Sequence, residues 1–433
     1  MFAAGRTSLL LLMVLLAGTV PAAHAAPEIG IGENNDALFA DPLFAPLGVK
    51  HVRVVVAYDV VAAAQRGDDE LARVTRYLTG AAAGGHEPLV AFEHSRGDAH
   101  ACARDAALPQ CRLPSPAEYE RSFRAFRERF PQVRAFTPWN EPNHQTQPTA
   151  SSPEAAARFS GIAARECPGC TIVIGDVLDL PDATRARRPT YRRAERWIGR
   201  FRAALRTPRE VCGLHNYSDV NRFRFTGTRA LMGALGCRRY WLTETGGIVR
   251  SRGLGHDPDR QLPAVRHLLR AAAAEPAIQR VYLYTWFGGV TPQWDSGLVL
   301  RRGDGTTVAR PAYELVRRRL AGAAPPPAPF EAELRQLTDV ALPAWVALQT
   351  PLNVFANPSA AERAKGFEGF APPMLMYALQ RTGERQGDPA RIAAATRAWP
   401  YAVAPDHASP FDIIAAAYAL RDLTLTPDLR THT

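Results

Sequence analysis

The chain has 433 residues, of which 46% are hydrophobic and 22% are charged, and its formal net charge is +10. This balance excludes a disordered, collagen-like or membrane-transporter protein, and the length suffices for one large domain or two ordinary ones. The positive charge does not indicate a nucleic-acid partner, because no aromatic-basic module and no extended run of Lys or Arg accompanies it.

The first 25 residues have the order of a secretory signal peptide. Arg6 precedes an apolar run over residues 9–20, and small residues follow up to Ala25. We expect cleavage after Ala25 and no stable membrane insertion, because the run is too short for a permanent anchor. A buried helix of the fold is the alternative interpretation.

Six cysteines agree with export to an oxidising compartment. Six cysteines allow fifteen pairings, and proximity in the sequence favours three of them. These are Cys102–Cys111, Cys167–Cys170 and Cys212–Cys237. A zinc site at Cys167 and Cys170 is the competing reading, but a second matched Cys pair of the same spacing is missing.

Eight short apolar runs follow the signal, and they are unbroken rather than alternating, as is typical of parallel strands buried on both faces. They are Glu28–Gly32, Val52–Ala57, Pro88–Phe92, Val133–Pro138, Thr171–Gly175, Val211–His215, Arg239–Thr243 and Arg280–Thr285.

Helical signals lie between these runs. Ser115-Pro116-Ala117-Glu118 is a capping box with Pro at the first helical position. Further helices are expected from Ser152 onward and at Asp68–Leu78, Thr190–Leu205, Leu262–Ala274 and Pro311–Leu320. Eight strands alternating with helices over residues 27–320 predict an α/β protein with a (β/α)8 TIM barrel. A doubly wound open sheet is the alternative, although no GxGxxG or P-loop motif supports its nucleotide-binding versions.

The last hundred residues differ in pattern from the barrel region. Residues 321–330 read as a stiff Pro/Ala linker. Residues 331–433 show helical signals without strands, so we expect a small C-terminal α-helical appendage, to which we assign no role.

Polar and aromatic residues follow the predicted strands, and the carboxyl ends of barrel strands form the active-site face of this fold. Glu141 follows the fourth strand, and Glu244 ends the seventh. Two carboxyl groups at facing strand ends suit glycosidic bond cleavage, in which one protonates the leaving oxygen and the other attacks the anomeric carbon. Ionisation of one should raise the pKa of the other and keep the acid protonated near neutral pH.

The motifs around both glutamates resemble those of the clan A glycoside hydrolases. Trp139-Asn140-Glu141-Pro142-Asn143 is similar to their Asn-Glu-Pro signature, with a lean toward xylosidase- or iduronidase-type members. The segment from Trp241 to Gly246 is similar to their strand-seven nucleophile segment. This resemblance, over residues 27–320, implies a TIM barrel and a retaining mechanism with Glu141 as acid/base and Glu244 as nucleophile.

Seven further residues are candidates for substrate contact: Arg53, His94, Trp139, Asn140, His215, Tyr217 and Trp286. The aromatic residues could stack on sugar faces, and Arg53 could instead position Glu244. His94 could equally be a packed core histidine, and Asp176 reads as an ion-pair or rim group. Arg222, Arg224, Arg250 and Arg252 could recognise an acidic sugar or simply form a solvated rim.

The sequence therefore predicts a secreted retaining glycoside hydrolase that acts on an oligo- or polysaccharide. A transglycosidase would use the same two carboxyl groups. The alternative of another class is a non-catalytic carbohydrate-binding or cell-surface protein on a degenerate barrel, which would not need two glutamates. No metal or cofactor is expected, and the sequence does not indicate the oligomeric state or the glycan.

Overall fold

The computed structural model describes residues 26–322, apart from residues 66, 68, 99–100, 103 and 183–188. The predicted signal peptide, nearly all of the Pro/Ala linker and the predicted C-terminal helices lie outside the described residues. Within them, no helix is long and apolar enough to cross a membrane.

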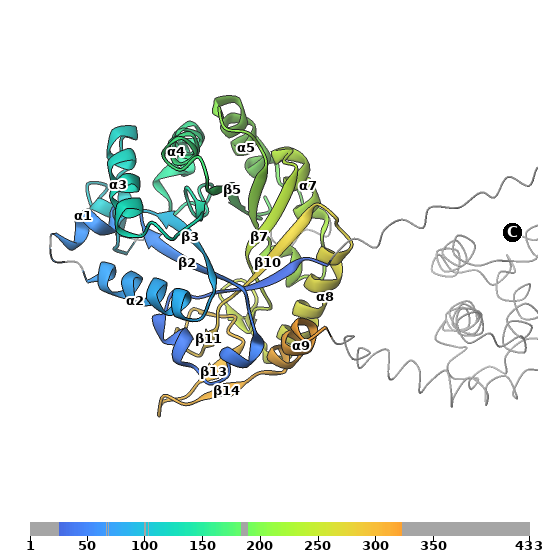
Figure 1. Cartoon of the computed structure of the whole chain (residues 1–433). Helices are drawn as coiled ribbons and strands as arrows, with labels where there is room; N and C mark the ends of the chain where they lie inside the picture. The colour runs from blue at the N-terminus through green and yellow to red at the C-terminus, as the bar shows by residue number, and fades with distance from the viewer. Residues whose placement is uncertain are drawn as a thin grey trace, which may run out of the picture. The chain divides into compact units, whose positions relative to one another are not determined.

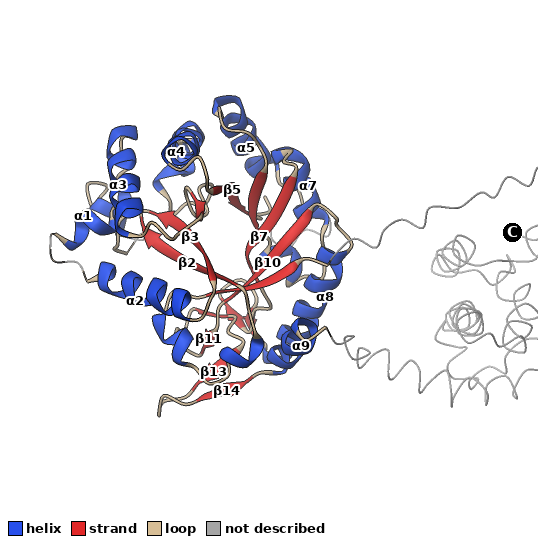
Figure 2. Cartoon of the chain, viewed as in Figure 1, coloured by secondary structure: helices blue, strands red, loops and turns tan. Residues whose placement is uncertain are grey.

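Eight parallel strands close into a barrel, as the sequence predicts, in the order β1-β10-β7-β6-β5-β4-β3-β2. They are β1 (Glu28–Gly32), β2 (His51–Ala57), β3 (Glu87–Glu93), β4 (Ala135–Thr137), β5 (Thr171–Leu178), β6 (Val211–His215), β7 (Arg239–Thr245) and β10 (Ile278–Tyr284). Figure 1 shows the strands in the centre and the helices around them, and Figure 2 separates the two layers by colour. The fold is a (β/α)8 TIM barrel.

The helices that surround the barrel follow the amphipathic stretches of the sequence. They are α1 (Val60–Ala64), α2 (Glu70–Ala83), α3 (Pro116–Arg129), α4 (Pro153–Glu166), α5 (Arg192–Ala204), α6 (Tyr217–Val220), α7 (Thr226–Leu235), α8 (Gln261–Ala273) and α9 (Pro311–Leu320). The capping box at the start of α3 is present, because the Ser115 hydroxyl accepts from the Glu118 amide and the Glu118 carboxylate accepts from the Ser115 amide. Helix α7 and the short α1 and α6 were not predicted.

Two small sheets lie in the loops that follow β7 and β10. The first, in the order β12-β8-β9, joins β8 (Arg250–Ser251), β9 (Gly255–His256) and β12 (Trp294–Asp295). The second, in the order β11-β13-β14, joins β11 (Phe287–Gly288), β13 (Val299–Arg301) and β14 (Thr307–Ala309). Strands of two to three residues carry too little hydrophobic pattern to be recognised in a sequence.

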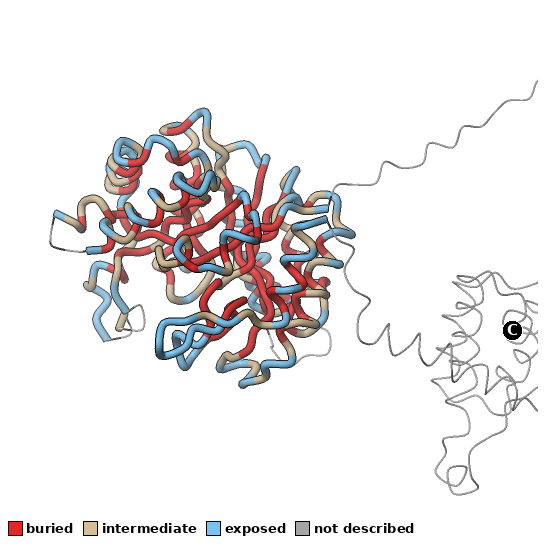
Figure 3. Tube along the Cα trace, turned by 60° about the horizontal axis from the view of Figure 1, so that its bottom comes forward, coloured by how far each residue is buried: buried red, intermediate tan, exposed pale blue. Residues whose placement is uncertain are grey.

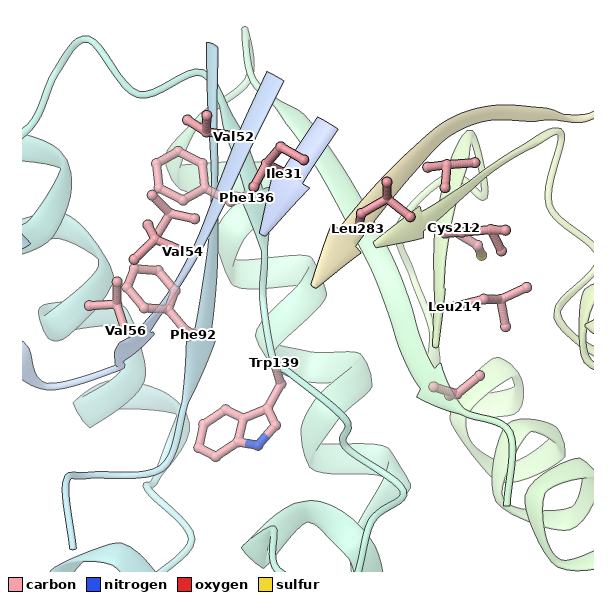
Figure 4. Close-up of a cluster of buried hydrophobic side chains, with 14 of the residues drawn as sticks. Ile31, Val52, Val54, Val56, Phe92, Phe136, Trp139, Cys212, Leu214 and Leu283 are labelled. Atoms are coloured by element: carbon pink, nitrogen blue, oxygen red, sulfur yellow. The ribbon is translucent and has the colours of Figure 1, made fainter. Parts of the chain in front are cut away.

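The core has two parts. The larger one lies between the strands and the helices and includes Val54, Phe92 and Phe136, as Figure 4 shows. The smaller one contains buried residues of five barrel strands, Leu89, Val173, Val211, Trp241 and Tyr282. Burial therefore concentrates on the strands and on the helix faces that cover them, while the outer helix faces remain exposed (Figure 3).

The six cysteines lie in three pairs at disulfide distance, and the pairs are the ones that the sequence predicts. Their Cα–Cα separations of 5.4, 5.3 and 6.0 Å are within the ordinary range for disulfides. No free cysteine remains among the described residues. Three such pairs fit an extracellular protein.

Candidate active site

A cavity of about 660 Å³ opens at the carboxyl ends of the barrel strands. Glu141, in the loop after β4, and Glu244, on β7, both line it together with Tyr217. One oxygen of each carboxyl group and one ring nitrogen of His215 all lie within 4.8 Å of one another. The two predicted carboxyl groups are thus brought together at one end of the barrel.

Glu244 is held by two donors. The Arg53 guanidinium on β2 donates from Nη1 to Glu244 Oε2 at 2.7 Å, and the Tyr217 hydroxyl donates to Oε1 at 3.2 Å. Arg53 also donates from Nη2 to Asn140 Oδ1 at 2.6 Å. Because Arg53 is only 1% exposed, its charge acts on these partners with little screening by water.

His215, at the end of β6, bridges Glu141 and a third carboxylate. Its Nδ1 lies 2.9 Å from Glu141 Oε1, and its Nε2 lies 3.3 Å from Asp176 Oδ2. Burial opposes protonation of the ring, but the charges of Asp176 and Glu244 outweigh it and raise the pKa of His215 to about 10. His215 is therefore an imidazolium at neutral pH and donates through both nitrogens.

Asp176, on β5, also belongs to this network, although its sequence context predicts only an ion-pair or rim group. It is fully buried, pairs with Arg53 at 3.3 Å and accepts a hydrogen bond from Thr243. Gly213 on the neighbouring β6 makes room for it, since a Cβ there would overlap with the Asp176 carboxylate. Despite its burial, the adjacent cations keep the pKa of Asp176 below its ordinary value.

The backbone is strained at two of these positions. Glu141 has a φ of 42° and Asp176 a φ of 51°, and only one other non-glycine residue among those described, Phe223, has a positive φ. Side chains rarely occupy this region, so surrounding contacts must hold it, and such residues cluster at functional sites.

The two glutamates differ in their proton affinity. Burial is the largest influence on both and opposes ionisation. At Glu141 the hydrogen bond and charge of His215 outweigh burial and lower the pKa. At Glu244 burial, reinforced by the charge of Glu141, outweighs His215 and Arg53, so the pKa is raised. This order is the reverse of the one expected for a proton donor at Glu141.

Tyr217 is the one predicted contact residue that lines the cavity. Arg53, Asn140 and His215 belong to the hydrogen-bonded network of the two glutamates, and the other three pack elsewhere. Trp139 is 2% exposed, packs against Phe159 at a centroid distance of 5.2 Å and donates its indole N–H to Gln147. Figure 4 shows it within the buried hydrophobic cluster. Its stacking on a sugar is therefore not supported, because its ring belongs to the aromatic core between barrel and helices.

Trp286 and His94 need the same correction. Trp286 is fully buried and packs against Phe44 at 5.3 Å and Tyr313 at 6.0 Å. The strand that precedes it ends at Tyr284, and it is Tyr284 that lines the cavity. His94 is buried with its Nδ1 on the Ser95 carbonyl, 2.7 Å away, which fits the packed-histidine alternative.

The four arginines of the predicted basic rim do not gather around the cavity. Only Arg222 lines the cavity, where it donates to the Ser218 carbonyl and hydroxyl. Arg224 lies 3.8 Å from Asp219, and Arg252 is exposed. Within the described part of the chain, no carboxylate forms an ion pair with Arg222.

The group of Glu141, His215 and Glu244 also meets the distance requirement for a metal site. However, His215 engages both ring nitrogens with carboxylates, and Arg53 already occupies Glu244 Oε2. A metal would have to displace these contacts and share the site with two cations. The donor set therefore fits an ion-pair network better than a metal site.

Comparison with known proteins gives a likeness of architecture only. No protein-family model and no curated protein matches the chain. Among solved structures, a family 1 β-glucosidase from Thermotoga maritima is 11% identical with a TM-score of 0.47, and the match covers 67% of this chain and 86% of that one. A β-glucosidase from Exiguobacterium marinum is 12% identical with a TM-score of 0.46, covering 64% and 84% of the two chains. No functional conclusion for this chain follows from similarity at this level.

Proposed function

We propose that this protein is a secreted glycoside hydrolase that works with retention of anomeric configuration. The observation that carries the proposal is the approach of a Glu141 oxygen to within 4.8 Å of a Glu244 oxygen at the active-site end of the barrel. Retaining enzymes hold their two carboxyl groups about 5–5.5 Å apart, whereas inverting enzymes leave room for a water at about 6.5–9.5 Å. The resemblance of both motifs to clan A sequences and the three cysteine pairs support the same proposal.

In the first step Glu141 donates its proton to the glycosidic oxygen while a Glu244 oxygen attacks the anomeric carbon. The bond to the leaving group breaks, the alcohol departs with the proton, and a glycosyl ester forms on Glu244. In the second step Glu141 takes a proton from water, whose oxygen attacks the same carbon and releases Glu244. Both glutamates then regain their starting protonation states.

This division of roles requires the proton of the pair to be on Glu141 when substrate is bound. Arg53 and Tyr217 donate to Glu244 and so stabilise the ionised nucleophile. A glycosidic oxygen that accepts a hydrogen bond from Glu141 favours the protonated form of that carboxyl group. We infer that substrate binding shifts the proton from Glu244 to Glu141, and that the hydrogen bond between His215 and Glu141 then lengthens. We propose that Asn140 contacts a sugar hydroxyl through its side-chain N–H groups, since Arg53 already donates to its oxygen.

A hydrolysis screen over plant, fungal and bacterial glycans and a panel of aryl glycosides tests the proposal. The wild type should release sugar of the same anomeric form as the substrate, read by proton NMR during the first minutes. A 2-deoxy-2-fluoro glycoside of the active glycone should label Glu244, located by peptide mass spectrometry. Glu141→Gln and Glu244→Gln should lose turnover, while Glu128→Gln, on the exposed face of α3, should not. Inversion of the anomer, or full activity of both site variants, would refute the proposal.

A further inference from the structure

The cavity in front of the two glutamates is apolar over much of its wall. Seven of its lining residues have aliphatic, proline or indole side chains: Leu178, Leu180, Pro181, Ile248, Leu254, Val290 and Trp294. They come from the end of β5 and the segment after it, and from the loops after β7 and β10. A volume of about 660 Å³ lies within the range of sites for small molecules and exceeds what a single polar sugar needs.

The first part of this wall lies beside Glu141. The Asn143 side chain donates to the Leu178 carbonyl and accepts from the Leu178 amide, both at 2.9 Å, which ties the Glu141 loop to the end of β5. Asp179 then accepts from the Ser218 and Asp219 amides and fixes the segment that continues to Leu180. Since the acid/base lies next to the leaving-group oxygen, this wall borders the leaving group.

The second part belongs to the three-stranded sheet β12-β8-β9 and its neighbours. The Trp294 indole N–H already donates to Ser296 Oγ at 3.0 Å, and the ring meets Tyr217 edge-to-face at 5.0 Å. The Leu254 amide and carbonyl are occupied by Ser251 and Arg260. The polar groups of Trp294 and Leu254 are therefore engaged within the protein, and these two residues present apolar surface to the cavity.

Two side chains of the wall are exposed to an unusual degree. Leu180 is 40% and Val290 is 61% exposed, and both are among the five large hydrophobic side chains that are exposed in the described part of the chain. Exposed apolar side chains that gather at a cavity mark a binding groove, because contact with an apolar ligand removes them from water.

We propose that the leaving-group side of the cavity binds an apolar aglycone, so that the substrates are glycosides of alkyl or aryl alcohols rather than polysaccharides. The proposal rests on the proposed function, because it places the aglycone by the acid/base role of Glu141. It adds a substrate class that the two glutamates alone do not determine.

A series of alkyl glycosides tests this class without changing the chemistry of the leaving group. Methyl, butyl, hexyl and octyl glycosides of the glycone found in the screen have leaving groups of nearly equal acidity. We expect kcat/KM to rise by about twofold to fourfold for each methylene that reaches the wall, the range of transfer from water to an apolar site. The rise should persist at 1 M NaCl, because burial of apolar surface is not screened by salt.

Two variants locate the effect. Replacing both exposed side chains, Leu180→Ser with Val290→Ser, should flatten the dependence on chain length. Val308→Ser is the matched control, because Val308 is 37% exposed on β14 and is not part of the cavity lining. The control should keep the wild-type dependence.

The outcomes separate the two proposals. If glycosides are cleaved but methyl and octyl glycosides react equally, or acidic aglycones held through Arg222 react best, the apolar wall is refuted and the hydrolase stands. If nothing is cleaved, the proposed function fails. Binding of an apolar group to the cavity wall is then tested by the melting temperature of the protein with methyl glucoside and with octyl glucoside. A larger increase in melting temperature with octyl glucoside in the wild type than in the double variant would support it, and equal increases would refute it.

Discussion

The buried network behind the cavity is close to electrically neutral only if the two glutamates share one proton. Arg53 and His215 contribute two positive charges, and Asp176 contributes one negative charge. Two ionised glutamates would leave a net negative charge in a buried site, which is costly, whereas one proton on the pair balances it. The pair therefore titrates as a unit, and the position of its proton depends on the contact of His215 with Glu141.

The roles of Glu141 and Glu244 can be separated by the stereochemistry of azide rescue. Glu141→Ala should still form the glycosyl-enzyme with an activated glycosyl fluoride, because a good leaving group needs little acid help, and should then stall. Azide should attack that intermediate and give the anomer of the substrate. In Glu244→Ala azide should attack the substrate directly and give the inverted anomer. Proton NMR distinguishes the products, and the same anomer from both variants would contradict the assignment.

The raised pKa of His215 predicts a pH-dependent stability. The folded pKa of about 10 lies above the ordinary value of 6.5, so the stabilising contribution is complete below pH 6.5 and is lost as pH rises toward 10. We expect the free energy of unfolding in urea to fall from pH 7 to pH 10 in the wild type. His215→Asn should be less stable at pH 7 and show a smaller fall, whereas the exposed His256→Asn should keep the wild-type slope. Equal slopes in all three proteins would argue against a buried imidazolium.

The sequence predicts a site residue correctly only where the position of that residue relative to a strand end is enough to place it in the site. Glu141 and Glu244 were found because a residue at the end of a parallel strand lies at the barrel mouth. Trp139, two residues before Glu141, instead packs in the aromatic core against Tyr119 of α3 and Phe159 of α4. Asp176 reads in the sequence as an ordinary ion-pair residue, because its partners lie on β2 and β6, far away in the chain.

Among the elements, the strands of the barrel were the most predictable. β1 and β6 have the predicted bounds, and the other six differ from prediction by one to three residues at an end. Their unbroken runs of Val, Ile and Leu are typical of strands that are buried on both faces, so these strands can be recognised in the sequence. The small sheets in the loops after β7 and β10 are built from strands of two or three residues, which leave no periodic signal, and β12 pairs with β8 across about forty residues of chain. The part of the apolar wall that these loops supply could therefore not be predicted from the sequence.

The loop after β4 predicts a positioning role for Asn143. Its two hydrogen bonds with Leu178 hold the strained turn that carries Glu141. Asn143→Ala should release this turn and lower kcat on the order of tenfold to a hundredfold, with little change in KM, because a displaced acid/base impairs chemistry more than binding. Asn143→Asp keeps one of the two bonds and should fall between the wild type and the alanine variant. An unchanged kcat in Asn143→Ala would show that the turn is held by other contacts.

Two of the disulfides of the barrel enclose loops of very different length. Cys212–Cys237 encloses β6 and α7 and joins residues 25 apart, whereas Cys167–Cys170 spans only three positions. In both pairs one cysteine is buried and the other half-buried, so the loss of packing on removal should be similar. The difference between them should therefore come from the entropy of the unfolded chain.

Removing the two disulfides should consequently have unequal effects on stability. The chain-entropy relation gives about 3.5 kcal/mol for a loop of 25 residues and roughly half of that for a loop of three. In urea unfolding, the double variant Cys212→Ala with Cys237→Ala should lose more free energy of unfolding than Cys167→Ala with Cys170→Ala. Mass spectrometry of the non-reduced wild type, which should find no free thiol, is the control. The reductant dithiothreitol should lower the wild-type midpoint and leave the double variants less affected. Equal losses would mean that packing, rather than restriction of the unfolded chain, dominates at both sites, and free thiols in the wild type would contradict the pairing itself.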